Sequence, residues 1–111
     1  NLLRACDLPN CRDGQQVKIL GLTTCRQRPG SASGVMFLTL EDETGVVNVV
    51  LWEQVQLRYR AEIKGGNILL IEGRLQVSDD TRQGKYAVIH LVGQKLHCLE
   101  WGEVQSVRSF H

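Results

Sequence analysis

The chain has 111 residues, a length that suits one domain with one hydrophobic core and is too short for two. Hydrophobic residues make up 42% of it and charged residues 23%, which excludes the highly charged, polar composition of disordered chains. The formal net charge is only +1, so electrostatic binding of nucleic acid would require local clusters of Arg and Lys.

The apolar stretches are short. The run Ile68–Ile71 is among the longest, far below the roughly 18 residues that a membrane span needs. No apolar signal-peptide core follows the N-terminus. We therefore expect a cytoplasmic protein with no membrane partner.

Four cysteines, Cys6, Cys11, Cys25 and Cys98, are spread along the chain without a C-x-x-C spacing. Only the C-x4-C at the start and His97 beside Cys98 favour a zinc site. In a reducing compartment, thiols stay free. The sequence therefore predicts four free thiols, no metal and no cofactor.

The N-terminal residues 1–16 have scattered apolar positions followed by Pro9, Asn10, Asp13 and Gly14. This pattern predicts an arm or short helix that ends in a turn. Ordered barrel structure is expected to begin near Val17.

The first predicted strand runs from Val17 to Arg26 and is rich in β-branched and apolar residues. Gly21 in its middle indicates a bend or a close backbone approach. Period-2 alternation places one set of residues on the same face. This set is Val17, Ile19, Gly21, Thr23 and Cys25.

A polar segment, residues 27–34, separates this strand from a hairpin and predicts a protruding loop. The hairpin consists of Val35–Glu41, a Gly-containing turn, and Val46–Trp52. Alternation places Met36, Leu38 and Leu40 inside the barrel and leaves Phe37 and Thr39 outside.

A helix is predicted between Trp52 and Gly65, and Gly65-Gly66 is a typical helix stop. Its apolar stripe is Trp52, Val55, Tyr59 and Ile63, at spacings of three, four and four.

Two more strands follow, Ile68–Val77 with Gly73 in its middle and Lys85–Val92. Residues 94–111 form a C-terminal extension. In it Gln94–Glu100 is either a closing helix or a final extended piece, and Trp101–His111 is a weakly structured tail.

The order of elements predicts the fold class. Five strands with one helix between the third and fourth are typical of the five-stranded Greek-key OB-fold barrel, an all-β fold with one helix. A small SH3-like barrel lacks that helix. We therefore expect the barrel to span residues 17–93.

Polar and basic residues around the first loop, with an outward aromatic residue, form the main binding signal. OB domains bind single strands with the face of their second and third strands and with the loops beside it. Arginine neutralises phosphate, an exposed aromatic ring stacks on bases, and asparagine offers a donor and an acceptor to a base edge. The candidates are Arg26, Gln27, Arg28, Ser31, Ser33, Phe37, Thr39 and Asn48.

A second set of candidates comes later in the chain: Arg74 and Gln76 on the fourth strand, Arg82 and Lys85 at the loop between the fourth and fifth strands, and His90. The first four could close a cationic channel on the far side of the groove. His90 is either a half-buried structural histidine or a group that stacks on a base or donates to phosphate. In the alternative interpretation, the arginines only solubilise a loop and Phe37 packs against a neighbouring domain.

No catalytic pattern is present, since the sequence lacks a nucleophile elbow, a phosphate-binding glycine loop and a metal-binding His pair. The acidic run Glu41–Glu43 is typical of a solvated hairpin turn. We therefore expect that the chain is not an enzyme by itself.

The run RQRPGSASGVMFLTLEDETGVVNVVLW, from Arg26 to Trp52, resembles the OB domain of bacterial C-family DNA polymerases. With the later LLIEGRLQ and the ending SVRSFH, it is more similar to the damage-inducible error-prone polymerase than to the replicative alpha subunit. The hairpin FLTLEDETG also resembles that of aminoacyl-tRNA synthetase anticodon-binding domains.

The polymerase resemblance implies a parent DNA-directed DNA polymerase for translesion synthesis, whose OB domain contacts single-stranded template DNA. It also implies, as partners, the other domains of that polymerase and accessory proteins of damage tolerance. Two alternatives remain open: an OB barrel for protein–protein docking, and an anticodon-type RNA-binding domain.

Overall fold

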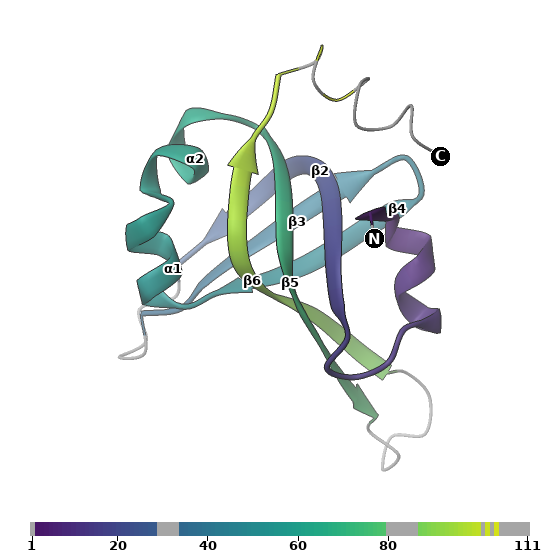
Figure 1. Ribbon diagram of the computed structural model, residues 1–111. Coiled ribbons are helices and arrows are strands. Elements are labelled where there is room, and N and C mark those ends of the chain that lie inside the picture. Colours follow the sequence, from purple (N-terminus) through teal and green to yellow (C-terminus); the bar gives the residue numbers. More distant parts are fainter. Residues whose placement is uncertain (1, 29–33, 80–86, 101, 103, 105–111) are drawn as a thin grey trace.

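The computed structural model describes residues 2–28, 34–79, 87–100, 102 and 104, and its main feature is a curved sheet closed into a barrel (Figure 1). The strands are β1 (Leu2–Leu3), β2 (Gln16–Gln27), β3 (Met36–Asp42), β4 (Gly45–Leu51), β5 (Ile68–Asp79) and β6 (Ala87–Cys98). The helices are the 3-10 helix η1 (Ala5–Asn10) and the α-helices α1 (Glu53–Arg58) and α2 (Arg60–Gly65).

Five strands close the barrel. The sheet order is β1-β2-β3-β4-β6-β5, and β5 also pairs with β2. All neighbours in the closed part are antiparallel except β4 and β6, which pair in parallel. This arrangement confirms the predicted OB-fold class.

Alternation along the strands fills the barrel with aliphatic side chains. In β3, Leu38 and Leu40 are buried, whereas Phe37 is exposed, as the pattern predicts. The side chains that are almost completely buried are Val17, Ile19, Leu38, Leu40, Val49, Leu51, Leu69, Ile71, Leu75, Leu91 and Leu96.

The N-terminal segment, for which the sequence predicts an arm or short helix, packs against the barrel, so the helical segment after β4 is not the only one associated with it. Ala5 and Leu8 of η1 are buried in the same core cluster as the strands. Strand β1 adds to the sheet in parallel with β2. Helices α1 and α2 lie on the opposite side of the barrel from η1 (Figure 1).

The predicted helix after β4 is divided in two at Tyr59, whose φ of −113° and ψ of 29° interrupt the helix. Ile63 is buried as expected, but Trp52 is 52% exposed. Trp52 has extended backbone angles and precedes the first turn, so the helical stripe does not include it. Gln56 is buried in this region instead.

Strand β6 continues to Cys98, so the predicted boundary at residue 93 falls inside it. The closing helix considered for Gln94–Glu100 was wrong, because Leu96 faces the core and pairs with Ile71. The extended alternative applies as far as Cys98. The predicted tail lies outside the described residues except for Gly102 and Val104.

Within the described ranges, no helix is long and apolar enough to cross a membrane.

Candidate nucleic-acid interface

The outer surface of β3, β4, β6 and β5, with the end of β2, presents two cross-strand rows of side chains, which we call the outer face. Residues paired across neighbouring strands point to the same side of a sheet. In the first row, the paired residues are Gln27, Phe37, Val50, Val92 and Arg74.

The second row lies beside the first. Cys25 pairs with Thr39, which pairs with Asn48. On the other half of the face, His90 pairs with Gln76. The parallel pairing of Val50 with Val92 places the two halves next to each other.

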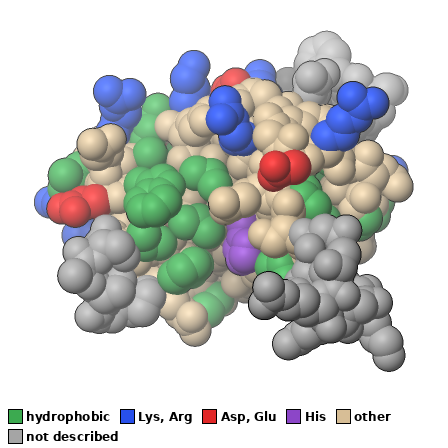
Figure 2. Space-filling model, turned by 90° about the horizontal axis from the view of Figure 1, so that it is seen from below, with side chains coloured by type: hydrophobic (Ala, Val, Ile, Leu, Met, Phe, Trp, Pro, Cys, Tyr) green, Lys and Arg blue, Asp and Glu red, His purple; other side chains and the backbone are tan. Residues whose placement is uncertain are grey.

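The outer face is mixed in character. Phe37 is 39% exposed, and Asn48, Arg74 and Gln76 are exposed, whereas His90 is partly buried. Seen from below, hydrophobic side chains gather near the middle of the molecule, and Lys and Arg side chains line its upper edge (Figure 2). A face of this kind can stack on a base and donate hydrogen bonds, but it holds little positive charge.

Six of the predicted site residues therefore share one surface: Phe37, Thr39, Asn48, Arg74, Gln76 and His90. Ser31, Ser33, Arg82 and Lys85 lie outside the described residues.

Arg26 and Arg28, which the sequence places around the first loop, lie beside the outer face and not on it. The register of β2 against β3 shifts between Thr23 and Cys25, which is a β-bulge. An extra residue in a strand reverses the side to which the following side chains point. Cys25 therefore points outward, and Arg26 pairs with the core residue Leu38.

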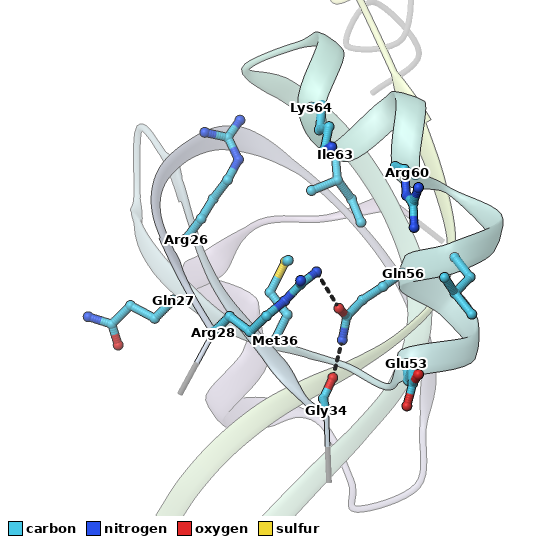
Figure 3. A pocket seen from close by; sticks show the side chains of 11 residues that line it. Arg26, Gln27, Arg28, Gly34, Met36, Glu53, Gln56, Arg60, Ile63 and Lys64 are labelled. Carbon is cyan, nitrogen blue, oxygen red and sulfur yellow. Dashed lines mark hydrogen bonds between the residues drawn. The ribbon is translucent and has the colours of Figure 1, made fainter. Parts of the chain in front are cut away.

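The two arginines line a pocket of about 940 Å³ between the end of β2 and the two α-helices (Figure 3). Four cations surround it, together with one carboxylate and several apolar side chains. The lining residues are Arg26, Gln27, Arg28, Gly34, Met36, Glu53, Gln56, Leu57, Arg60, Ile63 and Lys64.

Buried Gln56 connects this pocket to the chain around it. Its amide nitrogen donates to the carbonyl oxygens of Gly34 at 2.6 Å and Leu51 at 2.9 Å. Its amide oxygen accepts a 2.9 Å hydrogen bond from Arg28 (Figure 3). The guanidinium of Arg26 donates to the carbonyl of Gly66 at 3.2 Å.

Sequence reasoning missed Gln56, Arg60 and Lys64. The i, i+4 spacing of Arg60 and Lys64 indicates that they share a helix face, but not which strand that face meets. The burial of Gln56 leaves no signal in a periodicity of apolar residues.

The cysteines form no evident site. All four are free, and burial together with nearby Asp7 raises the pKa of the Cys11 thiol. Among the residues that the structure describes, no group of three or more His, Cys, Asp or Glu could hold a metal ion.

Comparison with known proteins identifies close sequence relatives. The chain is 45% identical over 85 residues to an error-prone DNA polymerase of Rhodopseudomonas palustris (strain HaA2), which is 77% of this chain and 7% of that protein. It is 46% identical over 84 residues to an error-prone DNA polymerase of Brucella abortus, again covering 7% of the relative. These matches confirm the resemblance to the error-prone polymerases, of which the chain spans about 7% of the length.

Solved structures share the fold. Asparaginyl-tRNA synthetase from Pyrococcus horikoshii superimposes with a TM-score of 0.66 at 23% identity, over 88% of this chain and 23% of that chain. RecG bound to a three-way DNA junction gives a TM-score of 0.64 at 14% identity, over 95% of this chain and 13% of that chain.

A family model described as "OB-fold nucleic acid binding domain" matches residues 13–98, which include every strand of the closed barrel and both α-helices. The chain therefore belongs to the family of OB-fold nucleic-acid-binding domains, in the form found in error-prone DNA polymerases.

Proposed function

We propose that the outer face binds single-stranded template DNA for a parent error-prone DNA polymerase acting in translesion synthesis in the cytoplasm. The observation that supports this proposal is the position of Phe37, an exposed aromatic ring on the mixed outer face of an OB barrel. The domain positions the strand and does no chemistry. The remainder of the polymerase and damage-tolerance proteins are its proposed partners.

The chemistry of the two rows suits a strand of variable sequence. Phe37 offers a stacking surface that every base can use, and Val50 and Val92 extend it as an apolar strip. Arg74 at the end of the strip neutralises a phosphate. Asn48 and His90 offer hydrogen bonds to base edges.

The test compares two exposed apolar residues. Phe37→Ala should weaken binding of a fluorescent oligothymidylate by about 1–3 kcal/mol, the value of one base–aromatic stack. Leu22→Ala is the matched control, because Leu22 is 42% exposed but pairs with Glu41 and Ile68, which belong to neither row of the outer face. Equal effects of the two substitutions would refute the assignment of this face.

The same titration with oligouridylate separates DNA from RNA binding. We expect the 2′-hydroxyl to add no affinity, whereas an anticodon-type domain would prefer the RNA strand.

Protein docking is the second candidate, because Val46 is 58% and Val88 45% exposed, and both are valines on this side of the sheet. Exposed apolar residues mark interaction surfaces when they form a contiguous patch. If Phe37→Ala leaves oligonucleotide binding unchanged while the domain stays folded, docking replaces DNA binding as the proposed function.

A further inference from the structure

The pocket between β2 and the α-helices collects more positive charge than any part of the outer face. Arg26 and Arg28 come from the end of β2, and Arg60 and Lys64 come from α2. Glu53 is the one carboxylate in the lining. In the described part of the chain, none of the four cations forms a salt bridge. Most of this charge is therefore available to an anionic ligand.

The pocket also has apolar surface. Ile63 is buried, Met36 is partly buried, and Leu57 is 58% exposed. Figure 3 shows Met36 and Ile63 between the arginine side chains. A flat, polarisable ring can pack on Met and aliphatic side chains while its charged substituent meets the cations. This combination fits a nucleotide better than a bare inorganic anion.

One arginine is held in place before any ligand binds. Arg28 donates to Gln56, which is only 6% exposed and is itself fixed by two backbone carbonyls. A guanidinium has five N–H donors, so this bond leaves others free. Such preorganisation reduces the entropy that binding a phosphate would cost.

The pocket adjoins the outer face through Gln27. Gln27 lines the pocket and pairs with Phe37 in the first row. Arg26 and Arg28, its neighbours in the chain, point to the pocket side (Figure 3). A nucleic-acid strand whose base stacks on Phe37 can therefore pass over Gln27 and place its next phosphates in the pocket.

We propose that this pocket is a second nucleic-acid subsite, which binds the base and phosphate of nucleotides that extend beyond the outer face. The inference rests on the proposed function, because it takes the outer face as the place where the strand first binds. An acidic peptide offers the same charge, but the continuity with Phe37 through Gln27 favours nucleic acid.

The test uses the 111-residue chain and two oligothymidylates of about 4 and about 16 nucleotides, the limits of OB-domain site sizes. Arg60→Ala should weaken binding of the longer strand several-fold. It should also reduce the slope of log affinity against log salt by about 0.7, the value for one phosphate contact on a single strand. The shorter strand, which fills only the outer face, should bind as before.

Arg58→Ala is the matched control, since Arg58 is an exposed arginine two residues away that does not line the pocket. Lys64→Ala provides a second variant with the same expected result. Equal losses of affinity for the longer oligothymidylate in Arg58→Ala and Arg60→Ala would overturn the subsite, because the loss of any one positive charge would then explain both. Equal losses for the short and long strands in Arg60→Ala would also overturn it.

Phe37→Ala in the same titrations separates the two proposals. If Phe37→Ala weakens binding of both oligothymidylates and Arg60→Ala weakens binding of neither, the outer face is supported as a binding site and the pocket is refuted. If Arg60→Ala weakens binding of the long oligothymidylate and Phe37→Ala weakens binding of neither, the pocket is supported as a binding site and the outer face is refuted. Tighter binding of a polyglutamate of about ten residues than of the long strand, lost in Arg60→Ala, would assign the pocket to an acidic peptide instead.

Discussion

Asp42 joins the N-terminal segment to the barrel through a set of hydrogen bonds. Its carboxylate accepts from the backbone N–H of Ala5 at 2.8 Å, and from the backbone N–H and hydroxyl of Thr44, both at 2.7 Å. It also accepts from the Gly45 N–H at 3.1 Å. The Cys6 N–H donates to the Thr44 hydroxyl at 3.0 Å. The acidic run Glu41–Glu43 thus contains a structural cap within the hairpin turn.

The Asp42 cap should make stability depend on pH. Burial alone would raise the pKa of this carboxyl, but the hydrogen bonds from Thr44, Ala5 and Gly45 outweigh it and lower the pKa below its ordinary 3.8. A lowered folded-state pKa stabilises the domain above the unfolded value, and this contribution is lost as the pH falls from about 3.8 through the folded value.

Urea unfolding of Asp42→Ala at neutral pH should show a loss of about 1.5–3 kcal/mol, the range for hydrogen bonds to a charged group. Below pH 4 the stability of the variant should also fall less steeply than that of the wild type. Glu41→Gln is the control, because Glu41 is exposed and adjacent. An equal loss in both variants would show that charge, rather than the cap, matters.

Gln56 of α1 also forms hydrogen bonds outside its own helix, since it bonds Leu51, Gly34 and Arg28. Gln56→Ala should destabilise the domain by about 1–3 kcal/mol, because two carbonyl oxygens lose their donor. Gln54→Ala, at an exposed position on the same helix, should stay within about 0.5 kcal/mol. Thermal unfolding of both variants measures the difference, and equal melting temperatures would contradict the expectation.

At the scale of elements, the β-bulge in β2 determines which side chains share a surface. Before it, Val17 and Ile19 follow the alternation read from the sequence, and after it Cys25 and Arg26 exchange sides. Strand β3 has no such irregularity against β4, so its outward residues are those that the sequence predicts. One register shift therefore keeps Arg26 and Arg28 off the outer face.

The close pairing of β5 with β6 depends on Gly73, which lies opposite Gly93. A Cβ at position 73 would overlap the carbonyl oxygen of Val92, which is backbone and cannot move aside. Gly73→Ala should therefore cost about 1–3 kcal/mol in chemical denaturation, as overpacking does. Gly65→Ala serves as the control, because nothing lies within 4 Å of a Cβ there. A neutral Gly73→Ala would mean that the two strands can separate at low cost.

At the scale of the whole molecule, a net charge of +1 hides an uneven distribution. Among the described residues, the two rows of the outer face contain the cation Arg74, whereas four cations surround the pocket beside it. Binding of a single strand should therefore combine a weakly salt-dependent stacking part with a more strongly salt-dependent part at the pocket.

Chemical modification of the exposed thiols can show where a bound DNA strand lies. Cys25 pairs with Thr39 on the outer face, whereas Cys6 lies in η1. Bound oligothymidylate of about 16 nucleotides should slow maleimide modification of Cys25 several-fold and leave Cys6 unchanged. Mass spectrometry of the modified chain measures both rates at once. Protection of Cys6 alone would place the strand on the other side of the barrel.

Much of the fold follows from local pattern. The five barrel strands, the helical segment after β4, and the outward position of Phe37 were predicted because alternation and glycine punctuation are properties of neighbouring residues. The same reasoning placed Phe37, Thr39 and Asn48 on one face, and the regular register of β3 against β4 agrees with this. It failed for Trp52, which lies one position before the first helical residue.

By itself, the sequence determined the order of the barrel strands, the residues that fill the barrel and the aromatic residue left outside. The tertiary structure alone decided that η1 completes the core, that Gln56 is buried, and that Arg26 and Arg28 share a pocket with Arg60 and Lys64. Each of these features depends on a contact between segments far apart in the chain. A bulge, a docked helix and a shared pocket are set by how such segments pair and pack, and the periodicity of one segment contains no information about its partner.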